Sequence, residues 1–517
     1  MKLKACQAIA ECLKAEKINI VFGYSGVAIA PLYDALCGAG IRHVNVRHEA
    51  NSGHTASGYA RISGKPAVCV ATSGPGATNL LTSIATAYAD SIPLIVITGQ
   101  VSSDRLGRDV FQEANITGAA EPFVKHSYLI NEACELPKIF KEAFYICKSG
   151  RPGPVLIDIP VDIQNDVIDF KYPKSIELRS YKPVQKGNAS QVKRVSEALM
   201  NAKMPLLCVG GGVFTSNATD KVIELSHRMN IPAVSTMMGV SVFEADDSLN
   251  FGMIGENGNS VANTALMLCD VLLVIGARVG DRSITQPEVI ADKTVIHIDI
   301  DPAEIGKNIS ANIPVVGDAG FVIEQILANA QPKEHKKWLD ELSEIKANSS
   351  EASELTEFFK SLSNKLPSNT MLTADLKLDD LWLSACINCC NGRFLTSGGM
   401  GTIGYAIPAA IGAKLATPEK AAIAVCSDKA FEMSFAELST AVECGADIKV
   451  IVISQAENNT TSPDYITLAQ AYGLNAVRAY CEAEINEAID KMLSADGTFL
   501  LELRMPQQKS DKQEVSM

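Results

Sequence analysis

The chain has 517 residues, which is too long for one hydrophobic core and predicts about three domains. Hydrophobic residues make up 47% of it and charged residues 20%, as in an ordinary globular protein. The formal net charge of −13 argues against a surface for nucleic acid or for an anionic membrane, because both require a basic face. A local basic pocket for a phosphate is still compatible with this charge.

The first 26 residues do not have the pattern of a signal peptide, because Glu11, Lys14, Glu16 and Lys17 interrupt their apolar residues. No apolar run reaches the roughly 20 residues that span a bilayer. The 14 cysteines are scattered along the chain. We therefore expect a reduced, cytoplasmic protein in which most thiols are small core residues.

One CxxC pair, Cys386 and Cys389, is followed directly by Cys390. A zinc site would need a second pair or nearby histidines, and none follows in the sequence. We interpret the cluster as a helix that carries cysteines, with a metal or redox role as the alternative.

Short apolar, β-rich runs alternate with helical stretches along the chain. Near-continuous Val/Ile/Leu strands predict a parallel sheet covered on both faces, and the alternation predicts doubly wound α/β domains. The clearest predicted strands are residues 67–72, 93–99, 154–160, 206–212, 271–277, 295–301, 421–427 and 448–454.

Two polar segments interrupt this alternation. Residues 171–190 contain two prolines, and residues 330–352 are rich in Lys and Glu, so both are predicted to be linkers. We therefore predict three doubly wound parallel-sheet domains and a disordered tail. Their ranges are 1–170, 186–330, 350–505 and, for the tail, 506–517.

Each predicted domain carries long motifs in a characteristic order. They are VRHEANSGHTASGYAR at 46–61, ATSGPGATNLLTSIATAYADSIPLIVITGQ at 71–100, VLLVIGARVGDR at 271–282 and LTSGGMGTIGYAIPAAIGAKLA at 395–416. Over nearly its whole length the chain resembles the large catalytic subunit of acetolactate synthase, a thiamine-diphosphate (ThDP) enzyme. The resemblance implies a pyrimidine-binding domain, a central FAD-type domain and a diphosphate-binding domain, in that order.

Glu49 is the first catalytic residue that the resemblance implies. ThDP becomes a carbon nucleophile when its own aminopyrimidine removes a proton. A buried carboxylate that hydrogen-bonds the pyrimidine nitrogen favours the tautomer that this requires. In the motif VRHEA that carboxylate corresponds to Glu49. The alternative is an ordinary acid at the start of a helix.

The run Ser73–Asn79 follows a predicted strand and opens a helix, and its glycines allow backbone to approach a flat ring closely. The resemblance assigns ThDP contacts to Gly26, Pro75 and Asn79 in the first domain. It also places Ile403 under the bent cofactor, although Ile403 alone would be read as a core residue.

The resemblance implies a substrate region as well. Phe111, Gln112 and Lys125 would line the site of the neighbouring subunit. Arg282 would bind the carboxylate of the acceptor keto acid, a task that suits a guanidinium group. The alternative for Arg282 is a surface ion pair.

A largely structural FAD is also implied. The expected contacts are Arg151, Gly210, Gly211, Gly258 and the acidic segment around position 300, where Ile300 lies between Asp299 and Asp301. Glu256–Asn257 stand where the family usually has Met-His, so this loop departs from the pattern.

The magnesium motif departs further. The family has Gly-Asp-Gly followed by Asn-Asn, whereas this chain has Ser427–Lys429 and later Ser454–Gln455. Asp428 and Gln455 are therefore the expected magnesium ligands and Lys429 a cofactor contact, although magnesium tolerates misplaced ligands poorly. Asn458–Asn459 is the alternative position of the second motif.

A phosphate-binding Gly-Gln-His segment of the family corresponds to Lys377–Asp379. Leu378 cannot hydrogen-bond a phosphate, and Asp379 would repel one. Neither Trp338 nor Trp382 can replace the tryptophan with which the family selects its acceptor. Two explanations stay open: Lys429 or Lys377 supplies charge in place of magnesium, or a Lys429–Asp379 pair fills the pocket and ThDP is not used normally.

The implied activity is a carboligase of branched-chain amino acid biosynthesis, which decarboxylates pyruvate and adds the two-carbon unit to a second 2-keto acid. Glu49 and Asp428 would come from different subunits, so a homodimer is the minimum, and a homotetramer or an added regulatory subunit is compatible with it. The alternatives are another ThDP-dependent decarboxylase, oxidase or sulfoacetaldehyde acetyltransferase, and a cofactor-defective paralogue with a binding or regulatory role.

Overall fold

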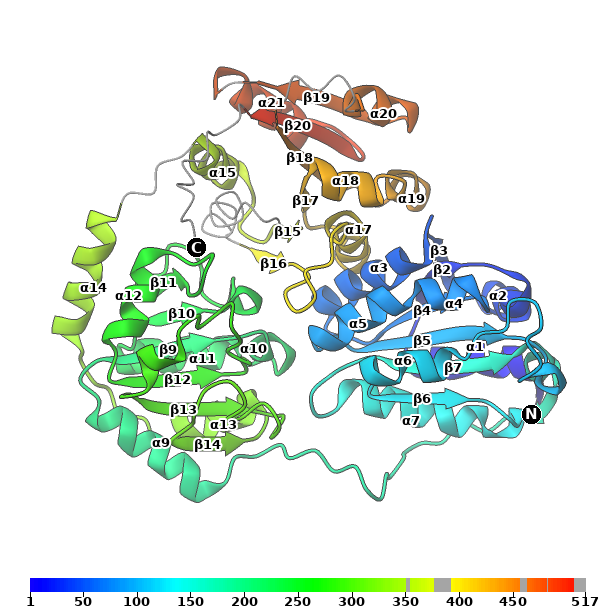
Figure 1. The fold of residues 1–517 in the computed structure, drawn as a ribbon, viewed down its shortest axis with the longest axis horizontal. Helices are drawn as coiled ribbons and strands as arrows, with labels where there is room; N and C mark the ends of the chain where they lie inside the picture. The colour runs from blue at the N-terminus through cyan, green and yellow to red at the C-terminus, as the bar shows by residue number, and fades with distance from the viewer. Residues whose placement is uncertain (350–353, 376–391, 456–462, 481, 506–517) are drawn as a thin grey trace, which may run out of the picture.

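A computed structural model describes residues 1–349, 354–375, 392–455, 463–480 and 482–505. These residues form three lobes, each built on one six-stranded sheet (Figure 1). Every pair of neighbouring strands within these three sheets is parallel. The predicted fold class, three doubly wound parallel-sheet domains, is confirmed.

The first sheet has the strand order β3-β2-β4-β5-β7-β6. Its strands are β2 (Ile20–Tyr24), β3 (Arg42–Asn45), β4 (Ala67–Ala71), β5 (Leu94–Gln100), β6 (His126–Leu129) and β7 (Val155–Pro160). Its helices are α1 (Ala5–Ala15), α2 (Ala30–Gly38), α3 (Glu49–Ser63), α4 (Pro75–Asn79), α5 (Leu81–Ala89), α6 (Ile116–Ala120), α7 (Leu136–Lys148) and α8 (Val161–Asn165). A two-stranded antiparallel pair, β1 (Lys2–Lys4) and β8 (Val167–Asp169), joins the two ends of the domain.

Both faces of this sheet are covered, as the apolar strands predict. Residues of α1, α2 and α7 pack on one face and residues of α3, α5 and α6 on the other, in two separate buried clusters. The covered faces leave the carboxyl ends of the strands as the place where a ligand can bind.

The second sheet has the order β11-β10-β9-β12-β13-β14. Its strands are β9 (Pro205–Val209), β10 (Ala233–Ser235), β11 (Asn250–Met253), β12 (Val271–Ile275), β13 (Thr294–Asp299) and β14 (Ile313–Val316). Its helices are α9 (Ala189–Asn201), α10 (Gly212–Thr215), α11 (Thr219–Met229), α12 (Ser260–Leu268), α13 (Ala319–Leu327) and α14 (Lys336–Asn348).

The third sheet has the order β16-β15-β17-β18-β20-β19. Its strands are β15 (Met371–Ala374), β16 (Arg393–Leu395), β17 (Ala422–Ser427), β18 (Lys449–Gln455), β19 (Asn475–Ala479) and β20 (Phe499–Met505). Its helices are α15 (Glu354–Lys365), α17 (Ala406–Ala416), α18 (Asp428–Ser434), α19 (Glu437–Cys444), α20 (Tyr465–Ala471) and α21 (Glu482–Ser494).

All eight predicted strands are present, with ends that differ by one or two residues except at the glycine turn that follows β9. In the predicted linker at 171–190, the chain crosses from the first domain to the second without a helix or strand until α9 begins at Ala189 (Figure 1). The second predicted linker is wrong in part. Residues 336–348 form α14, since Trp338 and Leu342 are buried against the core of the middle domain.

Helices α3 and α17 join the first and third domains, and Figure 1 shows α17 lying over α3. The two backbones come so close that a Cβ added to Gly58 would lie 2.0 Å from the carbonyl oxygen of Ala409. A Cβ added to Gly412 would lie 1.8 Å from the carbonyl oxygen of Thr55. Glycine at both positions therefore sets how closely these two domains dock.

Ten cysteines lie in the described residues, all with free thiols, and seven of them are buried, as expected for small core residues. The CxxC cluster lies outside the described residues. Among the helices that the structure describes, none combines the length and the apolar character needed to cross a membrane.

Candidate active site

Glu49 is the first residue of α3 and lies beside the turn that follows β4. Its Oε2 atom accepts a hydrogen bond from Nδ2 of Asn79 at 3.0 Å. A Cβ added to Gly76 would lie 3.5 Å from Oε1 of Glu49 and 2.7 Å from Cγ2 of Thr72. The fold thus brings together Glu49, which follows β3, and the Ser73–Asn79 run, which follows β4, at the carboxyl ends of the two strands that flank β2.

Two further residues expected from the sequence border this turn. A Cβ added to Gly26 would lie 2.5 Å from Cβ of Thr72, so the segments after β2 and β4 touch. A Cβ added to Gly74 would lie 2.8 Å from Cβ of Gln112, and Gln112 has a φ of 60°. Non-glycine residues adopt that conformation only when their surroundings impose it. Phe111, directly before it, is 87% exposed.

Lys125 lies in a different part of the first domain. Its Nζ donates hydrogen bonds to the carbonyl oxygens of Ile146 at 2.5 Å and Ser149 at 2.6 Å, and to Oη of Tyr181 at 2.9 Å. Burial lowers the pKa of this ammonium group to about 8. Its three acceptors tie the end of α7 to the linker that leaves the domain.

Arg151 connects the first domain to the middle one. Its Nη1 atom is 2.7 Å from Oε1 of Glu304 and 3.4 Å from Oδ2 of Asp301, and its Nε donates to Oγ of Ser91 at 2.8 Å. Asp299, at the end of β13, accepts the backbone N–H of Asp301 at 2.9 Å, and burial raises the pKa of its carboxyl to about 6. The expected FAD residue Arg151 therefore already has two carboxylate partners.

The glycine turn of the middle domain follows β9, as expected. A Cβ added to Gly210 would lie 2.3 Å from the carbonyl oxygen of Gly276, so this glycine is required by packing between β9 and β12. Gly258 is likewise packed against the backbone of its own loop. A Cβ added to Gly211 would meet only a side-chain atom at close range, the Cβ of Met238 at 3.1 Å.

Arg282 is exposed and forms an ion pair with Glu256, one of the two residues that depart from the family pattern. The backbone N–H of Glu256 also donates to the carbonyl oxygen of Arg282 at 3.2 Å. The loop around residue 256 therefore presents a carboxylate directly to the guanidinium that is expected to bind the acceptor.

The expected metal residues of the third domain lie at the carboxyl ends of neighbouring parallel strands. Asp428 follows β17 and opens α18, where its Oδ1 accepts the backbone N–H of Lys429 at 2.8 Å. Ser427 caps the same helix by accepting the N–H of Ala430 at 3.3 Å. Gln455 ends β18, which pairs with β17. Lys429 is exposed.

Other expected elements of this site fall outside the described residues: Lys377–Asp379, Trp382, Asn458–Asn459 and the side chain of Gln455. In the part of the chain that the structure describes, no group of three or more His, Cys, Asp or Glu side chains could hold a metal ion. Ile403 lies in the loop before α17 and is 51% exposed.

Sequence reasoning missed two buried acids of the third domain. Asp375 follows β15 and accepts the backbone N–H groups of Tyr405 at 2.8 Å and Ala406 at 3.3 Å, and burial raises its pKa to about 7. Glu437 opens α19 and is 0% exposed. An acid directly after the apolar run MLTA was a usable signal for Asp375, whereas nothing local marks Glu437.

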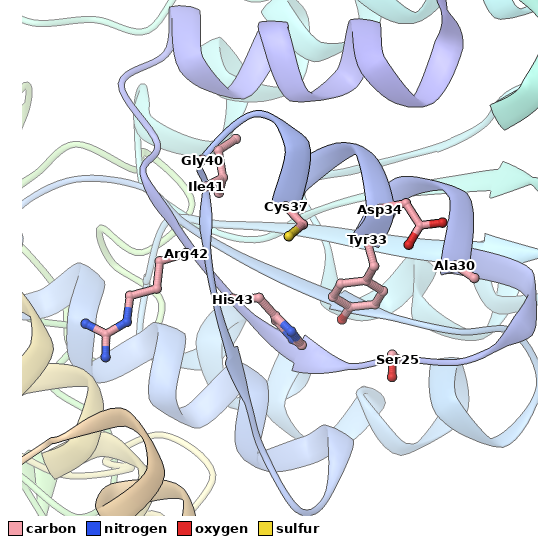
Figure 2. Close-up of a pocket in the computed structure, with 9 residues that line it drawn as sticks. All are labelled: Ser25, Ala30, Tyr33, Asp34, Cys37, Gly40, Ile41, Arg42 and His43. Atoms are coloured by element: carbon pink, nitrogen blue, oxygen red, sulfur yellow. The ribbon is translucent and has the colours of Figure 1, made fainter.

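A cavity of about 740 Å³ lies between α2 and β3 (Figure 2). Tyr33 and His43 point toward each other there, with ring centroids 4.4 Å apart, and Tyr33 donates to the carbonyl oxygen of Val70 at 2.9 Å. Its lining residues are Ser25, Ala30, Tyr33, Asp34, Cys37, Gly40, Ile41, Arg42 and His43.

Comparison with known proteins identifies all three domains. Residues 3–119 match the thiamine pyrophosphate enzyme, N-terminal TPP binding domain. Residues 192–326 match the central domain of the same enzymes, and residues 380–457 match their C-terminal TPP binding domain.

Whole-chain similarity points the same way. The chain is 39% identical to the probable acetolactate synthase large subunit of Methanocaldococcus jannaschii, over 97% of this chain and 92% of that protein. It is 37% identical to the acetolactate synthase large subunit of Corynebacterium glutamicum, over 95% and 84% of the two chains. It is 35% identical to that of Haemophilus influenzae, over 95% and 92%. The chain therefore belongs to the acetolactate synthase large-subunit family of thiamine pyrophosphate enzymes.

Proposed function

We propose that the chain is a ThDP-dependent carboligase, which decarboxylates pyruvate and joins the two-carbon unit to a second 2-keto acid. The observation that carries this proposal is the Glu49 carboxylate at the glycine-lined turn after β4. Asn79 donates a hydrogen bond to the Oε2 atom of this carboxylate, whereas the Oε1 atom faces Gly76. A carboxylate in this position can hold a proton at a pyrimidine nitrogen.

The first domain fits the pyrimidine half of ThDP. The turn offers backbone without side chains at Gly74 and Gly76, and a flat ring needs that close approach. When bound, ThDP supplies the carbon nucleophile that 2-keto acid decarboxylation requires. The residues of this chain orient it: Glu49 through the ring nitrogen and Gln112 from the loop that covers the turn.

The diphosphate half is proposed to bind at the carboxyl edge of the third sheet. Asp428 and Gln455 end neighbouring strands there, where doubly wound domains bind ligands. They would hold Mg²⁺, with Lys429 in the first turn of α18 adding positive charge beside the phosphates. An ammonium group at this point can supply the positive charge that the altered Gly-Asp-Gly motif no longer provides through magnesium.

Three finer features belong to the same proposal. FAD would bind at the glycine turn after β9. Arg151 would contact it either after leaving its carboxylate partners Asp301 and Glu304 or while still paired with them. Glu49 and Asp428 would meet across a homodimer interface in the cytoplasm. A regulatory subunit is proposed because several relatives are named large subunits.

Calorimetric titration of the purified protein with ThDP, with and without Mg²⁺, tests this proposal. Tight binding that requires Mg²⁺ supports Asp428 and Gln455 as ligands. Tight binding without Mg²⁺ supports Lys429 as the replacement charge, and Lys429→Met should then bind ThDP at least about tenfold more weakly, while Lys429→Arg should not. Stronger binding by Lys429→Gly would contradict that role.

A second candidate is a cofactor-defective paralogue with a binding or regulatory role, which the altered residues around Asp428 favour. It would be supported by absence of ThDP binding in both titrations. Product analysis with pyruvate separates a carboligase from a related ThDP-dependent decarboxylase, oxidase or acetyltransferase, because only the first yields acetolactate or a close analogue.

A further inference from the structure

Glu437 is a fully buried carboxylate at the first position of α19, in the third domain. Its Oε1 atom accepts the backbone N–H of Arg47 at 2.9 Å, the backbone N–H of His48 at 3.2 Å and Nδ2 of Asn51 at 2.9 Å. Its Oε2 atom accepts Oγ1 of Thr440 at 2.6 Å. Three of its four donors belong to the first domain, almost four hundred residues away in sequence.

This arrangement is not a salt bridge. The guanidinium of Arg47 points elsewhere, to Glu443, to Oγ of Ser439 at 2.8 Å and to the carbonyl oxygen of Asn45 at 2.9 Å. A carboxylate buried without its hydrogen bonds is strongly destabilising, so Glu437 depends on the amide donors of the 47–51 segment. Those amides in turn have a fixed acceptor only while α19 is docked.

The donors lie on both sides of Glu49. Arg47 and His48 directly precede it, and Asn51 is in the same first turn of α3. The contact between Oγ1 of Thr440 and the carbonyl oxygen of Asn45, at 3.3 Å, adds a second link from α19 to the same segment. The backbone that carries the Glu49 carboxylate is therefore held by the third domain as well as by its own.

We propose that Glu437 is a positioning residue that orients Glu49 toward the ThDP pyrimidine by fixing residues 47–51. The inference rests on the proposed function. It adds that α19, which follows α18 and its Asp428 in the chain, links the diphosphate-binding end of the third domain to the pyrimidine-binding end of the first.

The chain offers a matched control on the same helix. Glu443, which is exposed, also contacts Arg47, but through the half-buried guanidinium and not through the backbone. Glu443→Gln removes the same charge and should leave the 47–51 segment in place. Glu437→Gln keeps one acceptor oxygen for the three amides and can donate to Thr440, so it should still hold residues 47–51 in place for the most part. Glu437→Ala and the shorter Glu437→Asp should no longer hold residues 47–51 in place.

The first readout does not need the cofactor. Amide hydrogen exchange at Arg47 and His48 should be at least about tenfold faster in Glu437→Ala or Glu437→Asp than in the wild type or Glu443→Gln. Equal protection of these amides in all variants would overturn the inference. If Glu437→Ala does not fold, Glu437→Asp keeps the charge and still withdraws the acceptor.

The second readout concerns the bound cofactor. Exchange of the reactive-carbon proton of bound ThDP with deuterium, followed by NMR, should slow by about tenfold or more in Glu437→Asp, because misplacing a catalytic group by about 1 Å has such effects. The Kd for ThDP should change less than the exchange rate does. An unchanged exchange rate overturns the positioning role, whereas failure of the wild type to bind ThDP overturns the proposed function instead.

Discussion

At the scale of single residues, the neighbours of a charged side chain decide what that side chain can still bind. Arg282 illustrates this, because the resemblance implies that it binds the acceptor carboxylate, with a surface ion pair as the alternative, and the structure pairs it with Glu256. Both side chains are largely exposed, so the pair contributes little to stability. It does, however, place a competing carboxylate at the point where the substrate carboxylate would bind.

Replacing Glu256 by Gln should therefore strengthen binding of the acceptor 2-keto acid. We expect the KM for the second 2-keto acid to fall roughly two- to fivefold with kcat unchanged, because the exposed ion pair is worth at most about 1 kcal/mol. Steady-state kinetics with the acceptor varied measures this. The exposed Glu288→Gln serves as the control, and an unchanged KM in Glu256→Gln would show that Arg282 does not bind the acceptor.

Asp158 allows a prediction about pH. It is 1% exposed within β7, where Oδ1 accepts Oγ1 of Thr98 at 2.7 Å and Oδ2 accepts Nε2 of Gln100 at 2.9 Å. Burial raises its pKa to about 7. The folded state therefore keeps a proton that the unfolded state loses near pH 4, so this group stabilises the fold below about pH 4 and loses that contribution progressively up to about pH 7.

The variant Asp158→Asn has no carboxyl group to ionise, so it should not lose stability in this way as the pH rises. An Asn carbonyl can accept from Gln100 and its amide can donate to Thr98, so the hydrogen bonds survive. We expect the apparent Tm of the variant to fall less than that of the wild type between pH 5 and 8. The exposed Asp169→Asn should behave as the wild type does, and parallel pH profiles for all three proteins would contradict the raised pKa.

At the scale of elements, the docking of α3 on α17 depends on glycine at positions 58 and 412. Gly58→Ala or Gly412→Ala would place a methyl group within about 2 Å of a backbone oxygen, and a backbone cannot move aside as a side chain can. We expect each variant to be less stable by about 1–3 kcal/mol, the usual cost of overpacking. Thermal unfolding measures it.

Gly38→Ala is the comparison for these two variants, because Gly38 also lies in a helix, as the last residue of α2, but no atom lies within 4 Å of the added Cβ. It should unfold at the wild-type temperature or slightly above it. Wild-type stability for Gly58→Ala and Gly412→Ala would mean that the two helices are farther apart than the structure places them.

At the scale of the whole molecule, the proposed site needs residues from two subunits. Glu49→Gln and Asp428→Ala should each be inactive alone. When the two variants are unfolded, mixed equally and reassembled, half of the dimers should be mixed, and each mixed dimer should contain one intact site. Recovery of about a quarter of wild-type activity is expected for closed two-fold symmetry. No recovery would place Glu49 and Asp428 in the same chain's site.

The sequence by itself determined the fold class, the eight strands and the glycine turn beside Glu49, because strand patterns and turn residues act over a few neighbouring positions. It did not predict α14, whose Lys- and Glu-rich surface hid Trp338 and Leu342. Only the tertiary structure decided which partners Arg282, Arg151 and Glu437 have. Those partners lie 26, 153 and 390 residues away, and no local pattern encodes which distant donor or acceptor a buried or crowded charge will meet.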